Sequence, residues 1–135
     1  MALTMGITPQ RRGTPPAAGT FGAPVAPGET IWRGGLICWN ASGQLQRLQT
    51  AGSVSFAGLA SKDYMNTSAA TAWVGMEALK GTFGLTVPSA TYANINAPVY
   101  ATDDGTLTLT ASTNMQVGTL AGIENGQTYV KLLGS

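Results

Sequence analysis

The sequence contains no histidine, so it lacks the side chain that most often serves as a catalytic base, a metal ligand or a proton shuttle near neutral pH. Charged residues are also scarce, at 10% of the 135 residues against about 25% in ordinary soluble domains. The net charge of +1 leaves no basic stripe of the kind that neutralises nucleic-acid phosphates. The composition therefore argues against a nucleic-acid binder and favours a protein that lies against other protein.

The chain has a single cysteine, Cys38, so no disulfide can form within it. Cys38 lies in an apolar stretch beside Trp39, and without a histidine to act as base it is predicted to be a buried structural thiol. The sequence does not open with a basic segment followed by an apolar stretch, and no apolar run is long enough to span a bilayer. We therefore expect a soluble protein made in a reducing cytoplasm, with no membrane partner.

The first part of the chain has its own composition. Residues 1–28 hold five of the seven prolines and show neither helical nor strand periodicity. Because proline removes backbone donors and glycine costs entropy to order, we expect an extended arm here, followed by one folded domain over residues 29–135. Two interpretations are a plain disordered tail and an arm that binds a partner. Spaced anchors favour the second, and they are Leu3, Met5, Ile7, Arg11, Arg12 and Phe21.

Residues 29–135 carry turn signals about every ten positions, which predicts an all-β domain. Asp103–Gly105 and Asn125-Gly126 mark two closing hairpins, and the second dipeptide is typical of a type I′ turn. The other expected elements are strands at 31–32, 36–39, 44–49 and 53–60, a polar loop at 61–68, a broken strand at 73–87, and a turn or helical turn at 91–95. Within the strand at 53–60, Gly58 is expected at a bulge or a close contact. About eight short, mostly antiparallel strands indicate a small β-barrel or β-sandwich.

The carboxylates offer little chemistry. Two carboxylates can hydrolyse a glycosidic bond, but three of the six lie in predicted hairpin turns. The Asp103-Asp104-Gly105 segment lacks the further oxygen ligands of a calcium loop, which favours an ordinary turn. We predict no catalytic residue, no metal and no cofactor, so the chain is not expected to be an enzyme. The six carboxylate residues of the chain are Glu29, Asp63, Glu77, Asp103, Asp104 and Glu124.

The aromatic residues leave two interpretations open. Tryptophans in strands most often fill a core or a protein interface, and Trp39 is expected to be largely buried. Alternatively, Trp32, Trp39 and Trp73 form a stacking platform for sugars, which would make the chain a carbohydrate-binding or adhesion module. The other residues assigned to the core are Phe56, Phe83 and Tyr100.

Several segments in a fixed order resemble a known family. They are ETIWRGGLICWNASGQLQRL, VSFAGLAS, LKGTFGLTV, INAPVYATDDGTLTLT and VGTLAGIENGQTYVKLL. Together they cover about residues 29–133, and their order is similar to that of small tailed-phage capsid decoration, or cement, proteins. No single motif is specific, so the resemblance rests on the order of several. The arm over residues 1–28 is longer than this pattern leads us to expect.

The resemblance implies a β-barrel-like domain on the outer surface of a phage head. Such a protein clamps neighbouring major capsid subunits after the shell expands. Its implied partners are the major capsid protein and other copies of itself, as a dimer or trimer, with no nucleic acid. It is made in the host cytoplasm and resides on the capsid exterior of the virion. The family offers no catalytic residues to assign to this chain.

Overall fold

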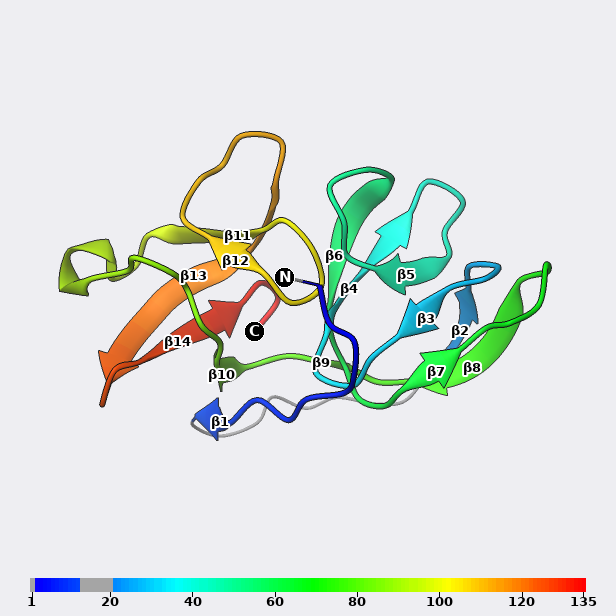
Figure 1. The fold of residues 1–135 in the computed structure, drawn as a ribbon, viewed down its shortest axis with the longest axis horizontal. Coiled ribbons are helices and arrows are strands. Elements are labelled where there is room, and N and C mark those ends of the chain that lie inside the picture. The colour runs from blue at the N-terminus through cyan, green and yellow to red at the C-terminus, as the bar shows by residue number, and fades with distance from the viewer. Residues whose placement is uncertain (1, 13–20) are drawn as a thin grey trace.

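The computed structural model describes residues 2–12 and 21–135, and these form three β-sheets with a single 3-10 turn, η1 (Tyr92–Asn94) (Figure 1). The N-terminal sheet has the strand order β8 (Ala72–Met76), β2 (Phe21–Val25), β5 (Leu45–Arg47), β4 (Leu36–Asn40), β6 (Ser53–Ala60) and β9 (Ala78–Leu79). The C-terminal sheet has the order β1 (Arg11–Arg12), β10 (Thr82–Gly84), β14 (Gln127–Leu132), β13 (Met115–Glu124), β11 (Pro98–Ala101) and β12 (Leu107–Thr108). A small third sheet pairs β3 (Thr30–Ile31) with β7 (Tyr64–Met65).

The strands pair almost entirely in the antiparallel sense, which confirms the predicted all-β class. Among the described ladders, only β2 and β5 run parallel, and they meet at Val25 and Leu45. Both large sheets remain open and have edge strands, so the architecture is like a β-sandwich and is not a closed barrel.

The core consists of two clusters that share strand β4. Leu36 and Cys38 point into a cluster that includes Leu120 and Val130 of the C-terminal sheet. Ile37, between them, points into a second cluster with Val25 and other residues of the N-terminal sheet. Because successive side chains of a strand face opposite sides, β4 contributes to both clusters and is buried on both faces.

Two backbone predictions are confirmed by the dihedral angles. Asn125 and Gly126 both have positive φ, 52° and 78°, as a type I′ hairpin turn requires. Gly58 has φ 147°, and a Cβ there would lie 2.7 Å from the Leu79 carbonyl oxygen. The pairing of β4 with β6 also shifts register beside Gly58, so this glycine serves both a bulge and a close contact.

The buried residues match the sequence-based core in part. Cys38 is fully buried as predicted, and its Sγ lies 2.9 Å from Ser53 Oγ. Phe83 is also buried, whereas Phe56 and Tyr100 are half-buried. Trp39 is likewise half-buried and packs against the second cluster, so it is less buried than the three residues that precede it in β4. The reason is position: Trp39 lies near the end of β4, where the chain leaves the sheet for the 40–43 turn.

Other strands appear where none was expected. The predicted loop at 61–68 contains β7, because Tyr64 and Met65 pair with Ile31 and Thr30, more than 30 positions earlier. The broken strand at 73–87 is confirmed as β8, β9 and β10. Short segments of this kind raise the number of described strands to fourteen, above the eight or so expected.

The predicted extended arm contains two strands, and both pair with strands that lie later in the sequence. Arg11–Arg12 form β1, and Phe21–Val25 form β2, which pairs with β8 over its whole length. Pro24 is tolerated in β2 because the other side of the strand makes a single pair, at Val25. The division into an arm and a domain at residue 28 stays a prediction, but β2 lies within the N-terminal sheet.

Candidate functional site

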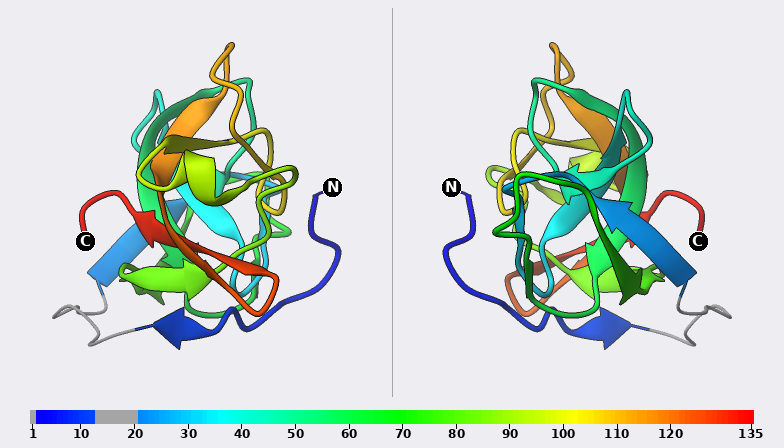
Figure 2. Two further views of the ribbon diagram at one scale, coloured as in Figure 1. Left: turned by 90° about the vertical axis from the view of Figure 1, so that its left-hand side faces the viewer. Right: turned by 90° about the vertical axis from the view of Figure 1, so that its right-hand side faces the viewer.

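Residues 2–12, here called the strap, carry most of the predicted partner-binding side chains. The strap passes over both large sheets, along the outside of the molecule (Figures 1 and 2). The Leu3 N–H donates to Asp104 Oδ1 at 2.9 Å, in the connection between β11 and β12. The Ile7 N–H donates to the Arg33 carbonyl at 2.7 Å, and the Gln10 carbonyl accepts from the Gly84 N–H at 2.8 Å. These bonds fasten one extended segment to both halves of the fold.

The strap packs closely against Gly34 at Ile7. Gly34 has φ +78°, and a Cβ on it would lie 2.7 Å from Ile7 Cγ1. A hollow of about 210 Å³ lies beside this contact, lined in part by Pro9, Leu79 and Phe83. A residue other than glycine at position 34 would therefore be strained and would also push the strap away from the body.

The two arginines of the strap bind their own chain. β1 adds antiparallel to β10, with Arg11 opposite Phe83 and Arg12 opposite Thr82. The Arg11 guanidinium lies 4.5 Å from the centre of the Phe83 ring, and it donates a hydrogen bond to the Lys80 carbonyl. Stacked cations of this kind are typical cation–π contacts.

Arg12 is held in a similar way. Its guanidinium lies 4.8 Å from the centre of the Tyr129 ring and forms an ion pair with Glu124. The hydrogen bond with Glu124 raises the pKa of Arg12 above its ordinary value. Both arginines therefore fix the strap to the C-terminal sheet. The sequence-based assignment of these two residues to contact with a partner stays a prediction.

Asp104 is a residue that sequence reasoning missed. The turn prediction fits Asp103, whose Oδ1 accepts the Gly105 N–H at 2.9 Å. Asp104 instead turns inward: it is buried, its Oδ1 binds the strap at Leu3, and its Oδ2 has no hydrogen-bond partner. Burial raises the pKa of Asp104. The local sequence Asp103-Asp104-Gly105 does not reveal which aspartate is buried. The burial of Asp104 depends on its contact with Leu3, about a hundred positions away.

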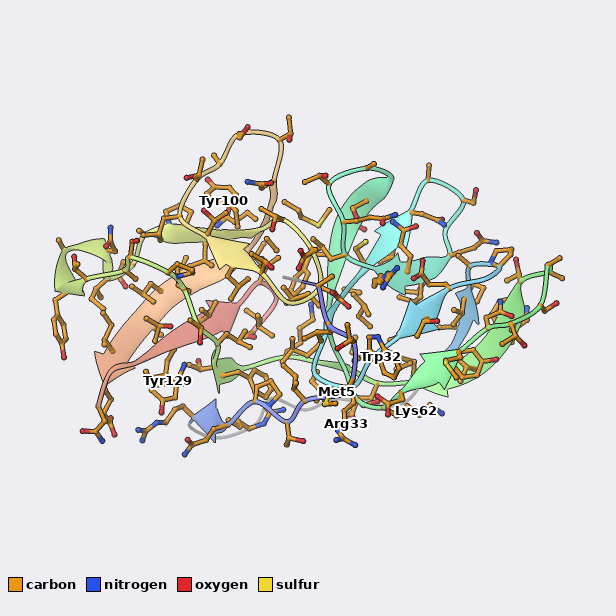
Figure 3. All side chains as sticks on the ribbon, viewed as in Figure 1. Met5, Trp32, Arg33, Lys62, Tyr100 and Tyr129 are labelled. Atoms are coloured by element: carbon orange, nitrogen blue, oxygen red, sulfur yellow. The ribbon has the colours of Figure 1, made fainter. Side chains whose placement is uncertain are left out.

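The remaining predicted anchors differ in exposure. Met5 is 67% exposed and Ile7 is 37% exposed, whereas Leu3 is half-buried. Figure 3 shows Met5 on the strap, beside the segment that carries Arg33. Phe21 belongs to β2 and pairs with Met76, and its side chain lies outside the described part of the structure. Of the apolar anchors on the strap, Met5 offers most surface to a partner.

Further large apolar side chains are exposed away from the strap. Trp73 on β8 is 73% exposed and Tyr92 in η1 is 72% exposed. Trp32 and Trp39 are half-buried. The three tryptophans thus differ in environment, and Trp73 is the one that presents most of its indole to the surroundings.

Comparison with known proteins adds no identification: no family model, curated protein or solved structure matches this chain. Within residues 2–12 and 21–135 no helix is long and apolar enough to cross a membrane. The same residues contain no group of three or more histidine, cysteine, aspartate or glutamate side chains placed to hold a metal ion. The strap and the exposed apolar side chains are therefore the features of the molecule that bear on its function.

Proposed function

We propose that this chain is a structural virion protein that binds the outer surface of a phage capsid and cements neighbouring major capsid subunits. The observation that carries the proposal is the strap, an extended segment that is fastened across both sheets and presents Met5 outward. A protein that cements a shell needs an extended, backbone-rich contact surface more than it needs a pocket. The resemblance of the ordered strand and turn segments to capsid decoration proteins supports the same proposal.

The contact with the capsid subunit uses the outer edge of β1. β1 is the terminal strand of the C-terminal sheet, so one side of its backbone pairs with β10 while the other faces away from the sheet. An extended segment of a capsid subunit can add to such an edge as a further strand. Met5, a few residues earlier, then supplies an apolar side chain with the conformational freedom to fit the partner surface.

Weak individual contacts suffice for this function. One molecule that engages two capsid subunits binds the second at a high effective concentration, so its avidity exceeds either single affinity. The low content of charged residues fits attachment through apolar and backbone contacts, and Arg11 and Arg12 are already engaged within the chain. Binding is therefore expected to weaken only slightly between low and physiological salt.

The second candidate is a carbohydrate-binding module, and the observation in its favour is the exposed Trp73. An indole face in this position can stack on a sugar ring. A glycan array probed with the full chain and with Trp73→Ala separates the two candidates. Specific glycan signals that vanish in the variant would favour the carbohydrate function.

The test of the capsid function is co-sedimentation of the full chain with expanded heads of the phage that encodes it. We expect binding to expanded heads and little binding to unexpanded ones. Met5→Ser should weaken binding, whereas Val54→Ser, a change at an equally exposed apolar residue on β6, should not. Failure of the unaltered chain to sediment with either form of the head would overturn the proposal.

A further inference from the structure

Strand β8 is an edge strand of the N-terminal sheet and carries no feature that would prevent another strand from pairing with it. One side of β8 pairs with β2 over all five residues in an unbroken register, and the other side has no strand beside it in the described structure. Its sequence, Ala-Trp-Val-Gly-Met, holds no charge and no proline. Charges, prolines and bulges are the usual features that keep the edge of a sheet from pairing with another chain. β8 has none of them.

The two faces of β8 differ in character. Met76 is buried, and Val74 packs against the core cluster of the N-terminal sheet. Trp73 and Gly75 lie on the opposite, outward face, because side chains alternate along a strand. Trp73 is 73% exposed there.

The outward face also contains a flat step beside Trp73. Gly75 is paired with Gly22 of β2, so two positions in a row across the sheet carry no side chain. Gly22 is exposed, and no atom lies within 4 Å of the place where a Cβ would stand on it. A bulky side chain that approaches from beyond the edge of β8 therefore meets two positions without side chains, Gly75 and then Gly22.

We propose that β8 pairs antiparallel with β8 of a second copy of this chain, around a two-fold axis at Val74. In this register Val74 faces Val74, and Ala72 faces Met76. Trp73 of each copy faces Gly75 of the other, so each indole covers the glycine step of its partner. Because the axis is two-fold, the contact between Trp73 of one copy and Gly75 of the other occurs twice. Cross-strand pairs between an aromatic residue and a glycine are a known means of stabilising and pinning the register of a sheet edge.

Charge and side-chain size together select this register over its neighbours. With the axis at Val74, the nearest carboxylate, Glu77, faces the hydroxyl side chain of Thr71. An axis moved to Gly75 would set Trp73 against Glu77. An axis moved to Trp73 would set the two indoles against each other and leave Gly75 facing Thr71. Only the central register gives a neutral strand pair in which each large side chain meets a small one.

The pairing joins two six-stranded N-terminal sheets into one continuous sheet across two copies. It uses the edge of β8, whereas the strap is bonded to Asp104, Arg33 and Gly84 and pairs with β10, so the strap stays free to meet another partner. The inference does not depend on the proposed capsid function, because the two copies need no capsid to associate.

Sedimentation equilibrium of the full chain over a wide concentration range tests this pairing. We expect a reversible dimer whose dissociation constant rises at least about tenfold in Trp73→Lys, as for the loss of a central aromatic anchor. Gly75→Thr should have a similar effect, because it fills the step while keeping a residue that favours strands; Gly75 has no positive φ that would oppose the change. Tyr92→Lys, a change at an equally exposed aromatic residue in η1, should leave the dimer unchanged.

Circular dichroism of each variant checks that the sheets remain folded. If Trp73→Lys fails to fold, Gly75→Thr and the concentration dependence of the total tryptophan emission of the unaltered chain still decide the question. Burial of the exposed Trp73 indole on association shifts that emission to the blue. A chain that stays monomeric at high concentration, or that forms trimers, overturns the proposal. So does a dimer that both β8 variants leave intact.

Discussion

Two segments of the predicted arm, the strap (residues 2–12) and strand β2 (Phe21–Val25), have similar sequences and different places in the fold. Both contain glycine and proline, and both space apolar residues two apart. The strap lies on the surface, with Met5 largely exposed, whereas β2 lies between β8 and β5 and its Val25 is fully buried. Local pattern thus predicts an extended backbone for both but does not say which one the fold encloses.

The difference originates in distant side chains that hold each segment. Asn66 is buried beside β2, and its Nδ2 donates to the carbonyls of Val25, Ala26 and Ala70 at 3.0–3.2 Å. Asp104 is buried beside the strap and accepts one hydrogen bond, from the Leu3 N–H, while its Oδ2 is unpaired. A buried polar group stabilises the structure when all of its hydrogen bonds are made. A buried polar atom without a hydrogen-bond partner costs free energy. β2 is therefore held by polar contacts that are fully made, whereas one of the several contacts that hold the strap leaves a buried oxygen unpaired.

The largest expected effect comes from truncation at two points. A chain that begins at Phe21 should unfold cooperatively close to the temperature of the full chain, because it keeps β2. A chain that begins at Glu29 should lose the cooperative unfolding of the N-terminal sheet, because β8 loses its partner strand and Asn66 loses two acceptors. Thermal unfolding followed by circular dichroism measures both. The sequence predicts one folded domain over residues 29–135, so the two truncations also test where that domain begins.

Val25→Ala should give the next largest effect. Removing two methyl groups from a fully buried site should lower the free energy of unfolding by about 2–3 kcal/mol, from lost burial and the cavity left behind. Val54→Ala is the matched control, since Val54 is 62% exposed and the change there should stay within about 0.5 kcal/mol. Urea unfolding of both variants gives the comparison. Equal losses at the two sites would place β2 on the surface.

Asn66→Ala should cost about 2 kcal/mol, because it leaves buried carbonyls of the β2 end without donors. Asn40→Ala should cost less than about 1 kcal/mol. Its Oδ1 accepts from the N–H groups of Ser42 and Gln44 in a surface turn, where water can replace it. The same urea series measures both, and a larger loss at Asn40 would contradict the proposed role of Asn66.

The local features were predictable and the distant ones were not. The Asn125-Gly126 turn, the bulge at Gly58 and the span of β6 follow from a few neighbouring residues, and the structure confirms them. β7 and β2 escaped prediction because their partners lie 20 or more positions away and their own sequences are short or contain proline. Asp104 escaped for the same reason, since its burial depends on Leu3.

A smaller effect is expected from pH at the strap. Burial raises the pKa of Asp104 in the folded chain, so the folded state holds this proton more tightly than the unfolded state. The contribution of Asp104 to stability is then greatest below the unfolded pKa of about 3.9, and it falls as pH rises through the raised folded value. Burial raises the pKa of Glu29 in the same direction.

Asp104→Asn tests this sign. The variant should lose less stability than the unaltered chain between acidic and neutral pH, because its side chain no longer ionises, while its Oδ1 can still accept the Leu3 N–H. Asp103→Asn should keep the fall seen in the unaltered chain, since Asp104 remains. Urea unfolding at a series of pH values measures the slopes. Parallel slopes for Asp104→Asn and the unaltered chain would remove Asp104 as the cause.

The central claim is that β2 is part of the folded N-terminal sheet, whereas the strap can detach without unfolding the rest of the chain. Hydrogen exchange in the unaltered full chain tests this claim most directly. The Ile7 N–H bonds to the Arg33 carbonyl at 2.7 Å, and the Ala26 N–H, just after β2, bonds to the Leu45 carbonyl at 3.0 Å. Both amides are hydrogen-bonded, so only the opening that exposes them differs. We predict that Ala26 exchanges only with global unfolding and that Ile7 exchanges through a local opening of much lower free energy. Equal protection of the two amides would contradict the account.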